Sequence, residues 1–152
     1  DAGKAKADAE KAKADAQKAK LDISIAQAEA ERKQAEAEKA KAAAEKAAND
    51  AEIQKFQDTK VKLTSVKSGS KRTAKVSWKT VKGADGYEIQ YARKANFAGK
   101  KKLLVKKGAA SSAKLRKLAG KKTYYVRVRA YQVTNGEKEY TRFSNKKKVR
   151  VK

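Results

Sequence analysis

The sequence contains no cysteine, no histidine, no methionine and no proline. Without cysteine, neither disulfides nor thiolate zinc sites can form. Without histidine, the usual general base and the commonest metal ligand are missing. Methionine is absent even at position 1, so we expect a processed form or a piece of a longer protein. From these absences we expect no catalytic residue, no metal and no cofactor.

Carboxylates and long apolar runs are also scarce. After residue 58 the only acidic residues are Asp85, Glu88, Glu137 and Glu139, and they sit in turns, hairpins or strands rather than in a recognisable acid and base pair. No nucleophile motif and no phosphate-binding glycine loop occurs, so we expect a protein that is not an enzyme. No apolar run approaches the roughly 20 residues that a membrane span needs, and no signal-peptide pattern is present.

Positive charge is abundant, but only in one part of the chain. Residues 1–58 hold 12 basic and 13 acidic residues, whereas residues 59–152 hold 29 and 4, a net charge of +25. A domain with this charge is attracted to phosphates, to teichoic or sialylated polymers, or to an acidic protein face. The alternative is a solvated surface with no ligand.

Residues 1–58 have the composition of one long helix. Alanine, lysine and glutamate dominate, and neither glycine nor proline interrupts residues 4–60. A seven-residue repeat begins at Lys4, and its a and d positions are filled almost entirely by alanine, with Lys33 as the break. Because alanine buries little area, a coiled coil built on this seam would be weak. We leave open a solitary or folded-back helix, weak self-association and other arrangements.

Two groups of bulky apolar residues stand out in this helix. Leu21 and Ile25 lie four residues apart on one face, while Ile23 lies on the alanine seam. They are either a local anchor in a coiled coil or a contact for a partner protein. The second hypothesis assigns these partner-binding residues: Lys18, Leu21, Asp22, Ile25, Glu29 and Arg32. Ile53 and Phe56, near the helix end, are expected to pack against the following domain.

Residues 59–152 show the alternation of a β-sandwich. The central strand is expected at 123–131, where Tyr124, Val126, Val128 and Ala130 form the buried face. The other expected strands are 61–66, 74–78, 87–91, 103–105, 113–118, 140–143 and 148–152. Asn135-Gly136 is the strongest hairpin signal in the chain. We therefore predict an all-β domain over 59–152 that follows a helical segment over 1–58.

The order of these features resembles a fibronectin type III domain of bacterial extracellular proteins. The matching segments are Val76-Ser77-Trp78, residues 83–91, Leu118 with residues 124–130, and Phe143-Ser144. The resemblance implies an immunoglobulin-like sandwich in which Trp78 is the core tryptophan. It also implies that the hydroxyl of Tyr124 bonds to the backbone near Leu118.

The outward positions of the central strand are a second candidate site. Tyr125, Arg127, Arg129 and Tyr131 are expected in one row beside Glu88 and Gln90. Tyrosine and arginine dominate binding hot spots, although arginine stems can equally cover the sheet and pair with Glu88. A polyanion site would join this row to Lys146, Lys147 and Lys148 and to the lysine clusters 100–102, 106–107 and 121–122.

The leading hypothesis is a secreted or cell-surface binding and adhesion module of a Gram-positive bacterium. The resemblance to large surface proteins suggests a host protein, with an antibody as a candidate, or a glycoconjugate as the partner. The alternatives are a fibre or spacer subunit that assembles through the alanine helix, and a polyanion-binding basic domain.

Overall fold

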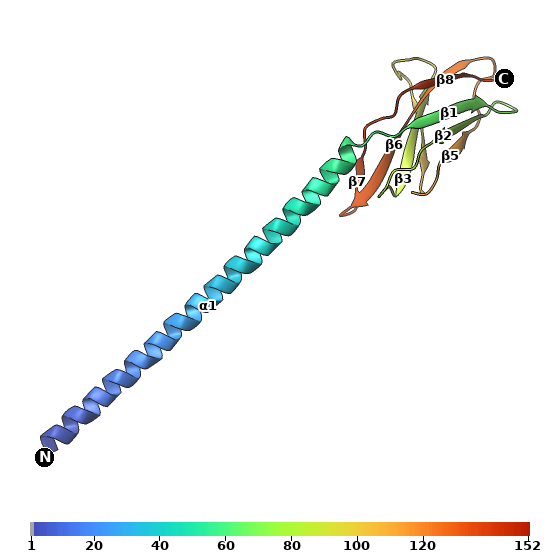
Figure 1. The fold of residues 1–152 in the computed structure, drawn as a ribbon. Helices are drawn as coiled ribbons and strands as arrows, with labels where there is room; N and C mark the ends of the chain where they lie inside the picture. Colours follow the sequence, from blue (N-terminus) through green and yellow to red (C-terminus); the bar gives the residue numbers. More distant parts are fainter. Residues whose placement is uncertain (1) are drawn as a thin grey trace. The chain divides into compact units, whose positions relative to one another are not determined.

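The computed structural model describes residues 2–152 and begins with one uninterrupted helix. Helix α1 spans Ala2–Asp58, 57 residues of mostly alanine and charged side chains (Figure 1). It ends where the Thr59 amide donates to the Phe56 carbonyl oxygen and the Thr59 hydroxyl donates to that of Lys55. No helix described between residues 2 and 152 is long and apolar enough to cross a membrane.

The chain divides into two compact units, one up to Asn49 and one from Asp50 to Lys152. Every side chain described in the first unit is exposed. The last turns of α1 belong to the second unit, where Phe56 is 7% exposed and joins the hydrophobic core. Ile53, three residues earlier, is half-buried.

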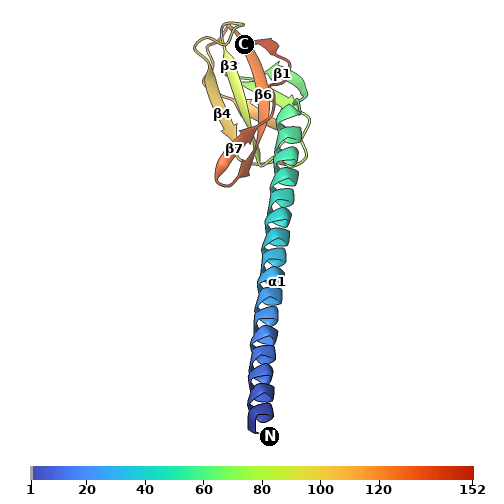
Figure 2. The ribbon, with the colours of Figure 1, turned by 90° about the vertical axis from the view of Figure 1, so that its left-hand side faces the viewer.

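The second unit is a sandwich of two antiparallel sheets, which confirms the predicted fold class. A three-stranded sheet has the order β1-β2-β5, and a five-stranded sheet has the order β4-β3-β6-β7 with β8 also paired to β6. Figure 2 shows β4, β3 and β6 side by side. The strands are β1 Leu63–Ser68, β2 Ala74–Trp78, β3 Gly86–Ala92, β4 Lys101–Val105, β5 Ser112–Leu115, β6 Thr123–Thr134, β7 Glu137–Tyr140 and β8 Lys147–Arg150.

Alternate residues of both sheets meet in one core. On β6, Val126, Val128 and Ala130 are fully buried, as the alternation predicted. Trp78 at 3% exposure packs on Tyr87 with ring centroids 5.1 Å apart. The Tyr124 hydroxyl accepts a hydrogen bond of 3.0 Å from the Ala119 amide, next to Leu118. These contacts join the two sheets and the turn before β6.

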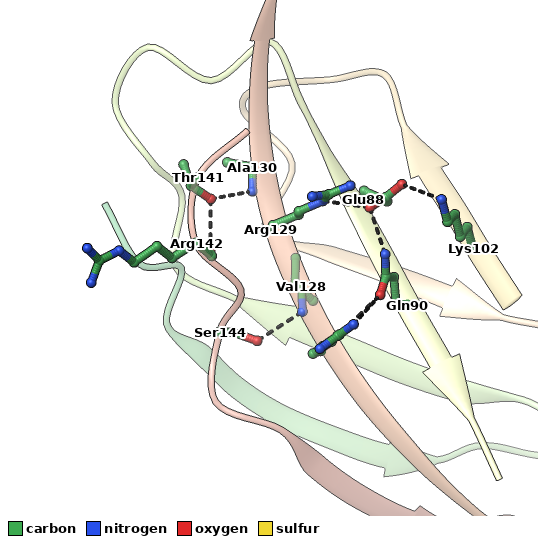
Figure 3. A network of polar contacts seen from close by, with 10 residues as sticks. Glu88, Gln90, Lys102, Val128, Arg129, Ala130, Thr141, Arg142 and Ser144 are labelled. Carbon is green, nitrogen blue, oxygen red and sulfur yellow. Dashed lines mark hydrogen bonds and ion pairs between the residues drawn. The ribbon is translucent and has the colours of Figure 1, made fainter. Parts of the chain in front are cut away.

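The expected strand at 140–143 is wrong. Asn135 and Gly136 have φ of 51° and 81°, the values of a two-residue type I′ turn, so β7 pairs with β6 immediately from Glu137. After Tyr140 the chain stops regular pairing but stays beside β6. There the Thr141 hydroxyl accepts from the Ala130 amide, and the Ser144 hydroxyl accepts from the Val128 amide, both at 2.9 Å (Figure 3). Side-chain oxygens thus replace carbonyls along this part of β6.

Candidate functional site

The outer face of β3 and β6 carries a buried ion pair. Glu88 lies directly opposite Arg129 in the antiparallel register, so the two side chains share one face. The Arg129 Nε donates to Glu88 Oε2 at 2.6 Å, Gln90 Nε2 donates to the same oxygen at 3.0 Å, and Lys102 Nζ lies 3.7 Å from Oε1. Figure 3 shows this cluster around Glu88, which is only 5% exposed. A carboxylate in this setting is held in place by its neighbours.

The surroundings of Glu88 fix its charge. Burial by itself would raise the pKa of Glu88, but the hydrogen bond and positive charge of Arg129, the Gln90 amide and the charge of Lys102 outweigh it. The pKa of Glu88 is therefore below its ordinary value. A carboxylate that stays ionised and paired is a poor proton donor near neutral pH.

Both arginines of this face are stacked between aromatic rings. The Arg127 guanidinium lies 4.2 Å from the ring centre of Phe97 and 3.9 Å from that of Phe143. The Arg129 guanidinium lies 3.7 Å from the ring centre of Tyr140 and 4.7 Å from that of Phe143. We call this alternating stack of Phe97, Arg127, Phe143, Arg129 and Tyr140 the arginine ladder. Cation–π contacts of this kind stabilise a protein most when they are partly desolvated.

Arg127 is also tied to the sheet by hydrogen bonds. Its Nε and one terminal nitrogen donate to Gln90 Oε1 at 3.0 and 2.8 Å. Burial and the nearby charge of Arg129 lower the pKa of Arg127, while Glu88 acts in the opposite direction. A guanidinium nevertheless stays protonated in proteins. The arginines are thus engaged within the protein, and the ladder covers the sheet.

The expected row of four outward side chains is wrong at Tyr131. Its side chain is 4% exposed, because the ring occupies the space where a Cβ on Gly86 would lie, and it packs on Tyr140 with ring centroids 6.1 Å apart. Tyr125, Arg127 and Arg129 are half-buried. The structure therefore brings Arg127 and Arg129 together but does not present an open row.

The other predicted site residues do not belong to the arginine ladder. Lys147 is half-buried at the start of β8, opposite Val126, and the Lys146 ammonium lies 3.5 Å from the Ala95 carbonyl oxygen. The helix set falls entirely in the first unit, and all its members are exposed: Lys18, Leu21, Asp22, Ile25, Glu29 and Arg32. Their ligand-binding roles stay predictions.

Two features of the site were not predicted from the sequence. Phe97 comes from the connection between β3 and β4, and Phe143 from the irregular segment after β7 rather than from the strand expected at 140–143, so the sequence pattern does not predict that either ring stacks on the arginines. A cavity of about 610 Å³ is lined by lysines of separate segments, including Lys55, Lys60 and Lys79. Since these residues precede and follow different strands, only the folded chain reveals the cavity. Among residues 2–152 no group of three or more acidic side chains is arranged to hold a metal.

Comparisons with known proteins agree with this architecture. The family model of the fibronectin type III domain matches residues 59–145, more than half of the chain. The chain is similar to the FN1-FN3 domains of chicken CNTN1, with 26% identity and a TM-score of 0.52 over 60% of this chain and 31% of that one. It thus spans about a third of that structure.

A second similar structure is the fibronectin type III domain derived from human KIAA0970 protein. Its identity is 15% and its TM-score 0.54, covering 67% of this chain and 81% of that one, which supports the fold alone. A search of curated proteins found no match. Because the family model covers most of the sandwich, whose strand order the structure shows directly, the chain belongs to the fibronectin type III domain family.

Proposed function

We propose that this chain is a non-enzymatic binding and adhesion module of a Gram-positive bacterial surface protein, secreted or held at the cell surface. Fibronectin type III domains are commonly binding or spacer modules. The only carboxylate within the ladder face, Glu88, is buried and paired, which leaves surface recognition as the chemistry best supported. The proposed partner is a host protein, with immunoglobulin as the first candidate.

The observation that supports this proposal is the exposure of bulky apolar side chains on α1. Leu21, Ile23 and Ile25 are 61%, 58% and 50% exposed, and they are the bulky apolar residues of α1 before Ile53. Among the other large apolar residues described, only Val133 at 50% and Leu104 at 37% are exposed. Single exposed apolar residues are common, but Leu21 and Ile25 lie four positions apart on one helix face, the spacing of anchor residues in helix-in-groove binding.

The pattern around this patch suits a groove-shaped partner. Leu21 and Ile25 share one face because residues four apart are neighbours on a helix. Asp22 and Glu29 lie on that face with Lys18 and Arg32, so the apolar pair has charges of both signs beside it. A partner of this chemistry offers an apolar groove with a mixed polar rim, the usual helix-in-groove arrangement.

The test compares two variants of the full chain in binding to immobilised immunoglobulin. Leu21→Ala with Ile25→Ala removes the pair, whereas Ile23→Ala removes an equally exposed residue on another face. We expect the double variant to lose about tenfold or more in affinity, a typical effect of removing anchor residues, and the control to lose little. Unchanged affinity of the double variant would reject the helix as the binding element.

A spacer or fibre function is favoured by a different observation. The alanine seam of α1 continues with one break at Lys33, and every residue that forms it between 2 and 49 is exposed. Assembly through this seam predicts a molar mass that rises with protein concentration in light scattering. A constant monomer mass up to high concentration would remove the fibre and leave the monomeric binder.

Binding of an anionic polymer is favoured by the charge of the second unit. Residues 59–152 carry 29 basic and 4 acidic side chains. The arginine ladder is engaged within the sheet, so this function depends on exposed lysines. It predicts affinity that falls steeply with salt, because each neutralised anion releases counterions. Binding of the polymer that persists at high salt would argue against it.

A further inference from the structure

The outward face of the sheet β1-β2-β5 consists of lysines and serines in register. Lys67 lies opposite Lys75, which lies opposite Lys114, so one row of three lysines crosses the sheet. The next outward row is Ser65, Ser77 and Ser112. We call these six residues the lysine–serine face.

The burial pattern shows that this face points to solvent. Ala74 and Val76 on either side of Lys75 are completely buried, and Lys75 itself is exposed, as strand alternation requires. Lys67 and Lys114 are exposed as well. With strands about 4.8 Å apart, the backbones of the outer two lysines are separated by only about 10 Å.

Nothing acidic in this part of the chain neutralises the row. Directly opposed like charges destabilise a sheet. The acidic residues beyond position 58 are elsewhere: Glu88 is paired with Arg129, Asp85 accepts from the Val133 amide, and Glu137 and Glu139 lie on β7. Across the described residues 2–152, no ion pair involves Lys67, Lys75 or Lys114. An external anion would relieve their mutual repulsion.

The face continues into a second basic feature. Beyond the lysine row lies a cavity of about 570 Å³ lined by Lys71, Arg72, Thr73, Arg116 and Lys117. Thr73 and Arg116 flank the Ala74 and Leu115 pair on the side away from Lys75 and Lys114. Three of the lining residues hold positive φ, at 50° for Lys71, 62° for Arg72 and 56° for Lys117. Non-glycine residues adopt this conformation at some cost, so the backbone of both turns is strained at these basic residues.

The serine row indicates the class of polymer. Hydroxyls both donate and accept, as sugar hydroxyls do. No hydrogen bond to the rest of the described chain uses the side chains of Ser65, Ser77 or Ser112. Trp78, the aromatic residue of these strands, is buried in the core, so the face offers no ring on which a nucleic-acid base can stack.

We propose that the lysine–serine face, with the basic cavity at its Arg116 end, binds a linear glycan or polyol polymer that carries repeated sulfate or phosphate groups. The lysines hold the anions and the serines contact the hydroxyls of the repeating units. This inference rests on the polymer-binding function proposed above and gives it a location on the sheet opposite to the arginine ladder.

The test titrates the full chain with heparin, with poly(glycerol phosphate) and with single-stranded oligo(dT) at two salt concentrations. The site variant is Lys67→Gln, Lys75→Gln and Lys114→Gln, and Lys75→Gln alone is a milder version. The matched control, Lys82→Gln, Lys94→Gln and Lys138→Gln, removes the same charge from exposed positions outside the lysine–serine face and outside the predicted polyanion clusters. Thermal unfolding followed by Trp78 fluorescence establishes that each variant is folded.

We expect the site variant to lose about tenfold or more in affinity for heparin or poly(glycerol phosphate) and the control about twofold or less. The slope of log affinity against log salt should fall by about two to three only in the site variant. The preferred polymer of the two then identifies the anion as sulfate or phosphate.

Three results would overturn the proposal in distinguishable ways. Equal losses of affinity in the site variant and the control would mean that polymer binding depends on the overall charge and not on this face. The polymer-binding function would then stand. No binding of the unaltered chain to any polymer would reject both. Oligo(dT) bound as tightly as the two hydroxylated polymers would reject the assignment to a glycan or polyol.

Discussion

At the scale of single residues, Glu88 organises the face of the larger sheet. It accepts from Arg129 and Gln90 and lies near Lys102, and Arg129 in turn stacks on Tyr140. A buried pair of this kind adds little net stability over an apolar pair, but breaking it leaves an uncompensated charge. Since Arg129 keeps 22% of its side chain exposed, solvent screens part of that charge. The loss on removing Glu88 should therefore be moderate.

Replacing Glu88 with glutamine should lower the free energy of unfolding at neutral pH by about 1–3 kcal/mol. The substitution should also weaken the dependence of the free energy of unfolding on pH in the acidic range. The pKa of Glu88 is lowered in the folded state, so its stabilisation is complete above the unfolded-state pKa of about 4.3 and is lost as the pH falls through the folded-state value. Urea unfolding at several acidic pH values, followed by Trp78 fluorescence, measures both effects.

Glu137→Gln is the matched control for this prediction, because Glu137 is exposed at the start of β7. It should leave both the stability and its acid dependence nearly unchanged. If Glu88→Gln kept the same acid dependence as the unaltered chain, the carboxylate would not be the group that couples folding to protons.

At the scale of elements, the alternation of residues predicted what each strand buries but not what covers it. Val126 and Val128 alternate with arginines, and this pattern alone places β6 in the sandwich core. On the other face of β6, the exposure of the arginine side chains depends on Phe97 and Phe143. Both rings belong to irregular segments from other parts of the chain. Strand alternation places Tyr131 on the outer face for the same reason, since only the fold reveals that its ring packs over Gly86.

The same limit explains the misplaced strand after Asn135-Gly136. The type I′ turn fixes the register of β7 from Glu137, whereas the two aromatic residues Tyr140 and Phe143 make the sequence pattern favour a strand at 140–143. Thr141 and Ser144 then continue the contact with β6 through their hydroxyls. The hydroxyl groups of serine and threonine are not usually expected to replace backbone carbonyls in strand pairing. The alternation of residues therefore does not indicate this contact.

Replacing Ser144 with alanine should destabilise the sandwich by about 1–3 kcal/mol, because the buried Val128 amide loses its acceptor. The Val128 amide should also exchange its hydrogen faster, which links the loss to this bond. Thr141→Val should act in the same way on the Ala130 amide. Chemical unfolding and amide exchange measure the two effects.

Ser111→Ala serves as the control for the hydroxyl variants, since Ser111 is exposed and its side chain should contribute less than about 0.5 kcal/mol. A Ser144→Ala protein with unaltered stability and unaltered exchange at Val128 would mean that water replaces the hydroxyl at no cost. The segment after β7 would then be held by its backbone bonds and the Thr141 hydroxyl.

At the scale of the whole molecule, charge and packing divide the chain in similar ways. The first 58 residues are almost neutral, and those described up to Asn49 are all exposed, whereas the residues from 59 carry a net charge of +25 around a buried core. Isolated helices form and melt gradually, while a packed sandwich unfolds cooperatively. Salt should act on the second unit far more than on the first, because it screens repulsion among lysines.

Heating should therefore reveal two transitions in the full chain. Far-UV circular dichroism, dominated by α1, should fall gradually over a broad range, and the fluorescence of Trp78 should change sharply at the melting temperature of the sandwich. Raising the salt concentration from low values to about 0.5 M should raise the melting temperature of the sandwich by several degrees and change the helical signal little.

Repeating the measurement at two protein concentrations separates this behaviour from self-association, which would sharpen the helical transition and make it concentration-dependent. Coincident transitions for both probes at every salt concentration would mean that helix and sandwich unfold as one cooperative unit, against the division at Asn49.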